Sequence, residues 1–215
     1  MLFIVVNALV FLHQFLLGPQ SEELFVASYA LVPQRLFSHG ASVRGAAPVG
    51  LTLFTSMFMH GGFLHVAGNM LYLWIFGNNV EDAMGRIRFI VFYLICGLVA
   101  AYSHALFNQA SLIPMIGASG AVSGVLGAYL LLYPRARVVT LIPLGFMVRL
   151  IEVPAMIVLG FWIVFQVLNA LLFSGEGGGV AWYAHVGGFV AGMALIGLFK
   201  RRSVPFGGGR SFAEL

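Results

Sequence analysis

The sequence predicts an all-α polytopic membrane protein, a bundle of six transmembrane helices with both termini cytoplasmic. The first observation is composition: of 215 residues, 60% are hydrophobic and only 8% are charged, whereas a soluble domain carries about 25% charged residues. The second is a mean hydropathy of +0.98. The third is an uneven distribution of basic residues along the chain. These observations exclude an ordinary soluble domain.

Six apolar stretches are expected to cross the membrane. Residues 1–17 have the hydrophobicity of a signal peptide but lack its basic start and small-residue cleavage site. We therefore interpret this stretch as a first helix, at the short limit of a span. The other expected spans are 63–80, 88–107, 117–133, 153–173 and 181–199.

The longest segment between expected spans is an outward loop, residues 18–62. Its apolar pieces are too short to cross a membrane, so we expect short helices lying against the bundle. A loop of this length in a compact protein is usually functional. Residues 1–200 then form one membrane domain, and the Gly-rich residues 201–215 are expected to form a disordered cytoplasmic tail. No appended soluble domain is expected.

Basic residues give the predicted orientation. Those expected on one side of the bundle are Arg86, Arg88, Arg135, Arg137, Arg149, Lys200, Arg201, Arg202 and Arg210. The other side has Arg35 and Arg44, both in the outward loop. This asymmetry predicts that the larger group is cytoplasmic. It also explains the net charge of +4 without nucleic acid, because no basic patch with interleaved aromatic residues is present.

Three of the expected spans begin at the outer side with polar residues. These residues are Ser119, His185 and, on one span, His65 with Asn69. At a rise of 1.5 Å per residue, they fall within roughly 10 Å of depth. Polar groups within a membrane are costly and mark a functional site by default.

Ser119 is a candidate nucleophile because the small residues around it leave its hydroxyl unshielded. A serine needs a base, and His185 can supply one because histidine titrates at about 6.5. Gly188 and Gly192 on one span and Gly120 on the other favour close approach of the two helices. The alternative is packing alone, with the serine bonded to a carbonyl one turn back.

Acyl transfer also needs hydrogen-bond donors for the developing oxyanion. His65 and Asn69 are spaced i, i+4 and share one helical face. The backbone N–H of Ser119 is a third candidate, because N–H groups in the first turn lack partners within the helix. The alternative for Asn69 is an interhelical hydrogen bond, and for His60 it is packing in the loop.

Other hydrolytic chemistries lack their residues in this sequence. Aspartyl proteolysis within the membrane needs two carboxylates, and the interiors of the expected spans contain none. A zinc hydrolase of the His-Glu-x-x-His type needs a motif that is absent. No aspartate is positioned to orient His185, so the expected catalytic set is a dyad.

Three motifs lie on or beside three of the expected spans. They are Gly117-Ala118-Ser119-Gly120, Ala184-His185 with Gly188 and Gly192, and His60 with His65 and Asn69. They resemble the G-x-S-G, A-H-x-x-G-x-x-x-G and H-x-x-x-x-H-x-x-x-N motifs of the rhomboid family of intramembrane serine proteases, in its bacterial six-span type. The resemblance covers essentially the whole chain.

The resemblance implies a six-helix bundle whose water-filled active site opens to the outer side of a bacterial inner membrane. It implies that Ser119 is the nucleophile, that His185 is the general base, and that His65 and Asn69 bind the oxyanion. The implied substrates are membrane proteins cleaved in the bilayer, in or near a transmembrane segment. No cofactor or metal is implied.

Two positions depart from the family pattern. Many members carry Trp-Arg in the long loop, where this chain has Gln34-Arg35, and many carry an aromatic residue four positions after the serine, where this chain has Ser123. Two interpretations of Ser123 stay open: it orients His185 through a hydrogen bond, or it bonds the carbonyl of Ser119.

Two rival functions are weighed against proteolysis. A catalytically inactive relative would bind or chaperone transmembrane helices, and loss of Ser119 or His185 would favour it, but both residues are present. A small channel or transporter would require carboxylates within the membrane or broken helices in matched halves, which the sequence does not indicate.

Overall fold

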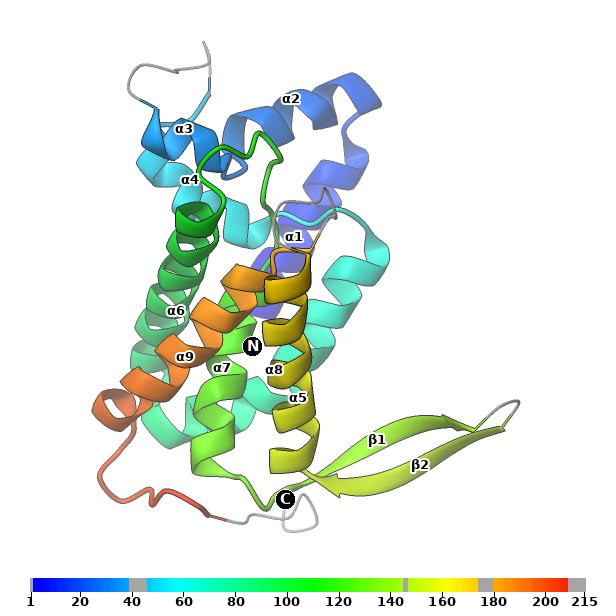
Figure 1. Cartoon of the computed structure of the whole chain (residues 1–215), viewed down its shortest axis with the longest axis vertical. Coiled ribbons are helices and arrows are strands. Elements are labelled where there is room, and N and C mark those ends of the chain that lie inside the picture. Colours follow the sequence, from blue (N-terminus) through cyan, green and yellow to red (C-terminus); the bar gives the residue numbers. More distant parts are fainter. Residues whose placement is uncertain (1, 39–45, 145–146, 174–179, 209–215) are drawn as a thin grey trace.

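The computed structural model describes residues 2–38, 46–144, 147–173 and 180–208, which are mostly helical (Figure 1). The longer helices are α1 (Leu2–Leu16), α5 (Phe63–Met84), α6 (Arg86–Phe107), α7 (Ser119–Leu132), α8 (Ala155–Leu172) and α9 (Trp182–Phe199). Shorter helices are α2 (Pro19–Tyr29), α3 (Pro33–Phe37), α4 (Val49–Thr55) and the 3-10 turn η1 (Ser56–Phe58). The two strands are β1 (Arg137–Leu144) and β2 (Met147–Pro154).

The six longer helices correspond closely to the six stretches expected from sequence. Among the described residues, α6, α8 and α9 are each long and apolar enough to cross a membrane. A fourth span is possible by the same measure if α5 is joined to α4 and η1, which meet it at a bend of 82°. The apolar helices α1 and α7 are shorter, at 15 and 14 residues.

Helix α7 is the centre of the bundle and is buried almost all round, as expected for a helix without a polar face. Its glycines bring α9 into direct backbone contact. A Cβ atom on Gly188 would overlap the carbonyl oxygen of Gly120, and one on Gly192 would overlap that of Gly124. On another side, Cys96 of α6 packs against Gly124. The glycine spacing therefore determines how closely these helices approach.

The long segment after α1 folds into short helices at one end of the bundle, as expected (Figure 1). Helices α2 and α3 each begin with proline, which suits a first helical position because its missing N–H has no partner there. The Arg35 guanidinium donates to the carbonyl of Ala27 at 2.7 Å. Leu31 pairs with Met115, which ties this segment to the loop before α7.

The stretch between α7 and α8, for which the sequence analysis gave no secondary structure, is an antiparallel β-hairpin. Its first strand is rich in β-branched residues, which favour extended backbone. The hairpin extends sideways from the lower end of the bundle (Figure 1).

The expected disordered tail differs from the structure over its first residues. The backbone N–H of Arg201 donates to Ala83 at 2.8 Å, and that of Gly207 donates to Leu131 at 3.0 Å. These bonds hold residues 201–208 against the ends of α5 and α7. Residues 209–215 lie outside the described residues.

Candidate active site

Ser119 is the first residue of α7, and His185 lies in the first turn of α9. The Ser119 hydroxyl and His185 Nε2 are 2.8 Å apart, a hydrogen-bond distance. The two residues are 66 positions apart in sequence, and the direct contact between the glycines of α7 and α9 brings them together. The structure thus gives the serine a basic neighbour.

The other ring nitrogen of His185 has a partner that the sequence did not suggest. Nδ1 lies 2.7 Å from the side-chain oxygen of Gln166, a buried residue of α8. An amide oxygen only accepts, so Nδ1 carries the hydrogen and Nε2 is left to accept from the serine hydroxyl. This is the tautomer that a general base requires. A glutamine in the middle of an apolar helix was the available signal.

Two tryptophans flank the same imidazole. The ring of Trp162 lies one turn before Gln166, with its centroid 5.8 Å from that of His185 and an interplanar angle of 37°. Trp182 approaches edge-on at 6.3 Å and 89°. Aromatic contact with His185 therefore comes from α8 and α9, whereas the family pattern places it four residues after the serine.

The contacts of Ser123 agree with the second of the two interpretations given above, a hydrogen bond to the carbonyl of Ser119. Its hydroxyl donates to the carbonyl of Ser119 at 2.6 Å, within its own helix. This contact favours the bond within the helix, since the carbonyl one turn back is within reach of a helical serine. The contact to His185 Nδ1 comes from Gln166.

His65 and Asn69 line the same cavity as Ser119 and His185, a space of about 1370 Å³. The backbone N–H of Gly61 donates to His65 Nδ1 at 3.3 Å, so His65 Nε2 carries a hydrogen. A Cβ placed on Gly117 would lie 2.8 Å from that Nε2 and 3.7 Å from the Ser119 hydroxyl. His65 thus presents a donor beside the serine. Gly117, with φ of 130° and no side chain, leaves the gap open.

Asn69 presents a second donor. Its side chain is buried, and its amide nitrogen makes no hydrogen bond with any residue that the structure describes. An unmade hydrogen bond of this kind costs about 1–3 kcal/mol. Asn69 thus lines the cavity with a buried amide N–H that has no partner among the described residues. The backbone N–H of Ser119, in the first turn of α7, adds a third candidate donor.

His60 links the site to α1. Its backbone N–H donates to the Gln14 side chain at 3.0 Å, and the Gln14 amide donates back to the His60 carbonyl at 3.3 Å. The Ala118 N–H points to His60 Nε2 at 3.5 Å. The ring meets His65 edge-on at 5.1 Å. These contacts favour the packing interpretation of His60, as a support beneath the loop before Ser119.

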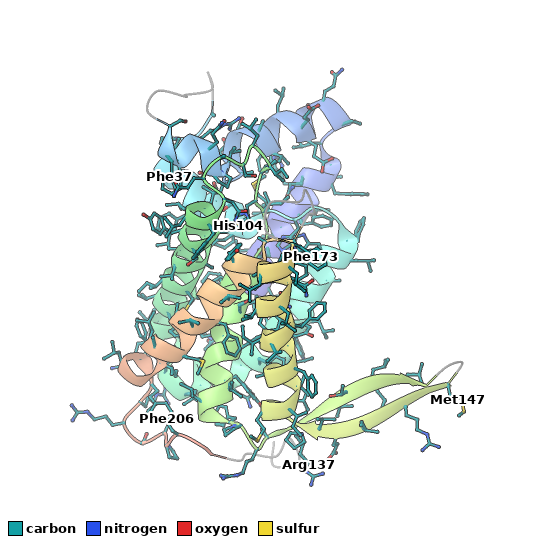
Figure 2. All side chains as sticks on the ribbon, in the orientation of Figure 1. Phe37, His104, Arg137, Met147, Phe173 and Phe206 are labelled. Carbon is teal, nitrogen blue, oxygen red and sulfur yellow. The ribbon has the colours of Figure 1, made fainter. Side chains whose placement is uncertain are left out.

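His104 of α6 also lines the cavity. The sequence analysis did not identify it as a candidate site residue. Figure 2 shows it at the same end of the bundle as Phe173, which follows α8 and lines the cavity too. The signal was a histidine inside an apolar span. Within the described ranges, no group of His, Cys, Asp or Glu could hold a metal ion.

The fold and site define a class: a helical membrane protein in which a serine and a histidine meet in an open cavity among apolar helices. The chain belongs to the rhomboid family, whose Rhomboid domain model matches residues 49–202. Members of this family are integral membrane proteins.

Three curated relatives illustrate the similarity. RHOMBOID-like protein 1 of Arabidopsis thaliana is 28% identical over 206 residues, which are 92% of this chain and 49% of the relative. Rhomboid protein 1, mitochondrial, of Saccharomyces cerevisiae is 30% identical over 163 residues, or 72% and 43%. Rhomboid protease GluP of Bacillus subtilis is 36% identical over 143 residues, or 66% and 25%. The chain thus spans half or less of the length of these relatives.

Proposed function

We propose that this protein is an intramembrane serine endopeptidase that cleaves transmembrane segments of other membrane proteins through a Ser119–His185 dyad. The observation that carries the proposal is the pair of hydrogen-bond distances at His185, 2.8 Å to Ser119 and 2.7 Å to Gln166. The first joins nucleophile to base, and the second fixes the base in the tautomer that accepts a proton.

In the acylation step, the Ser119 oxygen attacks the scissile carbonyl carbon while its proton moves to His185 Nε2. The carbonyl oxygen becomes an oxyanion, which accepts hydrogen bonds from His65 Nε2, the Asn69 amide and the Ser119 N–H. The imidazolium then returns its proton to the leaving amine, and the C–N bond breaks. Donors fixed in advance at such a site lower the barrier most effectively.

In the deacylation step, a water molecule gives a proton to His185 Nε2 and attacks the acyl-serine. The C–O bond to Ser119 breaks, and the proton returns to the serine oxygen. Gln166 keeps its hydrogen bond to Nδ1 throughout both steps. Because the glutamine is neutral, it orients the ring without adding a negative charge.

We extend the proposal to topology. Helices α1, α5, α6, α7, α8 and α9 cross a bacterial inner membrane, with both termini cytoplasmic and the cavity open to the outer side. Helix α7, with 14 residues, is about 21 Å long, shorter than a hydrocarbon core of about 30 Å. Ser119 at its start therefore lies below the outer surface, where water reaches it through the cavity.

A fluorophosphonate probe tests the proposal on protein reconstituted in liposomes. The probe should label wild-type protein at Ser119, and the labelled protein should lose cleavage of a model transmembrane substrate. An inactive relative that only binds helices would bind the same substrate in a pull-down without cleaving it. Folded wild-type protein that neither reacts with the probe nor cleaves any of a panel of transmembrane substrates would overturn the proposal.

A further inference from the structure

The β1–β2 hairpin exposes large apolar side chains on both of its faces. Leu141 lies opposite Leu150 on one face, and Thr140 lies opposite Ile151 on the other. The exposed fractions in this group run from 41% at Ile151 to 68% at Leu150. The exposed apolar residues are Val139, Leu141, Met147, Val148, Leu150 and Ile151.

A hairpin with exposed apolar residues on both faces is not expected to be stable in water. An isolated two-stranded hairpin is marginally stable at best in water. Its two outer edges offer unpaired backbone groups, and exposed apolar strand edges promote aggregation. The apolar residues of the hairpin are therefore expected to contact something other than water.

The base of the hairpin is fixed to the bundle. The Ala155 N–H donates to the Ala136 carbonyl at 2.8 Å, and the Met156 N–H donates to Pro134 at 2.9 Å. Val138 is buried at this base. The hairpin therefore leaves the bundle in a defined direction, sideways across the long axis of the helices (Figure 1). Figure 2 shows Arg137 at its base and Met147 at its far end.

The apolar surface of the hairpin continues a surface that faces lipid. Strand β2 ends at Pro154, and α8 begins at the next residue without a linker. Helix α8 is one of the helices long and apolar enough to cross a membrane. It buries one narrow face and exposes apolar residues such as Ile157 and Phe161. The hairpin joins the start of α8, whereas Gln166, which contacts His185, lies about 16 Å further along the helix.

The arginines on and beside the hairpin indicate that its contact is with a lipid membrane. Arg137 and Arg149 are exposed on the hairpin, and Arg135 is exposed beside its base. Arg137 lies 3.5 Å from the Glu152 carboxylate in a solvent-exposed pair. Basic residues next to a span attract anionic lipid headgroups. Unpaired strand edges are not tolerated in the hydrocarbon core, so the interfacial zone suits both the apolar faces and the backbone.

We propose that the β1–β2 hairpin lies in the membrane–water interface at the end of the bundle opposite the cavity, with an anionic phospholipid surface as its partner. Its leucine and valine side chains enter the acyl boundary, and its arginines meet the headgroups. This role is independent of the proposed proteolysis, because it depends on lipid contact and not on Ser119.

The accessibility of a nitroxide spin label to a water-soluble nickel chelate and to oxygen measures how deeply the hairpin lies in the membrane. The full chain carrying Leu150→Cys is labelled with a nitroxide and placed, one copy per disc, in phosphatidylcholine–phosphatidylglycerol nanodiscs. Two further labels calibrate depth: Phe161→Cys on the lipid-facing side of α8, and Ser203→Cys on an exposed site after α9. The native Cys96 is buried, and the unmodified chain serves as the labelling blank.

The label at residue 150 should be several-fold less accessible to a water-soluble nickel chelate than the label at 203, with oxygen accessibility near that of the label at 161. Discs of phosphatidylcholine alone should lessen this protection. A label at 150 as accessible to nickel as that at 203 would refute the proposal. Protection that arises only in discs holding two copies would also refute it, because a second chain would then be the cover.

Discussion

The side-chain oxygen of Gln166 lies 2.7 Å from His185 Nδ1, which joins α8 to a serine–histidine pair supplied by α7 and α9. A serine protease triad uses a carboxylate at this position, which both orients the histidine and stabilises its charged form. A glutamine provides only the orientation. In the proposed mechanism, Gln166 is therefore a positioning residue, and its contribution is separable from that of Ser119.

Gln166→Leu should lower kcat about fivefold with little change in KM. The change leaves the buried Nδ1–H without an acceptor, and a hydrogen bond of this kind contributes about 1 kcal/mol, or several-fold in rate. Gln166→Glu should retain activity, with the rising limb of its pH–rate profile at higher pH, because a carboxylate stabilises the imidazolium. Steady-state kinetics over a pH series measure both effects.

Asn169→Leu is the matched control for Gln166. Asn169 is also an amide on α8, but its side chain bonds the Phe165 carbonyl within the helix. This variant should keep the wild-type pH profile. Equal losses in both variants would mean that Gln166 acts only through the stability of α8.

Ser119→Ala should abolish cleavage while leaving stability within about 1 kcal/mol of wild type, the usual net contribution of the one hydrogen bond to His185 that is lost. Loss of the nucleophile removes the acyl-enzyme route, and removal of one oxygen from a partly exposed site opens no sizeable cavity. Cleavage of a model transmembrane substrate and thermal unfolding in detergent measure the two properties. Substrate turnover by the variant at the wild-type rate would eliminate Ser119 as nucleophile.

Asn69→Ala should reduce kcat by about 10²–10³, the usual effect of removing one oxyanion donor, with KM nearly unchanged. Asn69→Leu, which keeps the side-chain volume, should lose kcat to the same extent without lowering the unfolding temperature, because the Asn69 amide nitrogen has no partner within the described structure. Kinetics and thermal unfolding of the same preparations separate catalysis from folding. A large drop in stability with only a small drop in kcat would support the interhelical hydrogen-bond alternative.

Gly192→Ala should destabilise the protein by about 1–3 kcal/mol, the usual cost of overpacking, and should lower kcat. Its new methyl group would overlap the Gly124 carbonyl, so α9 must move and carry His185 away from Ser119. Gly197→Ala is the control on the same helix, where the nearest atom to the new methyl is 3.9 Å away. Thermal unfolding should distinguish the two, and equal stability would contradict direct backbone contact.

Ser123→Ala should keep kcat within a factor of about three. Its hydroxyl bonds the Ser119 carbonyl inside α7, where a lost hydrogen bond costs at most about 1 kcal/mol because the carbonyl keeps its helical partner. Kinetics on the substrate used for Gln166→Leu allow a direct comparison. A loss in Ser123→Ala that exceeds the loss in Gln166→Leu would return the orienting role to Ser123.

The helices and the meeting of Ser119 with His185 could be predicted, because apolar length, polar depth and glycine spacing are all properties of local sequence. The partner of His185 could not. Gln166 stands out in the sequence as a polar residue within an apolar span, but nothing in residues 153–173 reveals which face of that helix turns toward α9, so its contact with His185 is seen only once the bundle is packed. The aromatic contact from Trp162 was missed for the same reason.

The β-hairpin was missed for a different reason. Short apolar runs have no periodicity that distinguishes a strand from a buried helix, and Val138–Val139 lies directly between two expected spans. Ser123 shows a third kind of limit. Whether its hydroxyl bonds the ring of His185 or the carbonyl of Ser119 depends on a free-energy difference of about 1 kcal/mol. Sequence spacing does not resolve a difference of that size.

The contact of Gly188 and Gly192 with the carbonyls of Gly120 and Gly124 also has an evolutionary consequence. Spacing between α7 and α9 is determined by main-chain atoms, which every sequence shares, and not by side-chain rotamers, which drift with each substitution. Exposed apolar residues of α8 that do not contact His185, such as Ile157 and Phe161, should therefore tolerate exchange without altering the gap between the serine and the histidine. Only the few positions at the crossing must stay without a side chain.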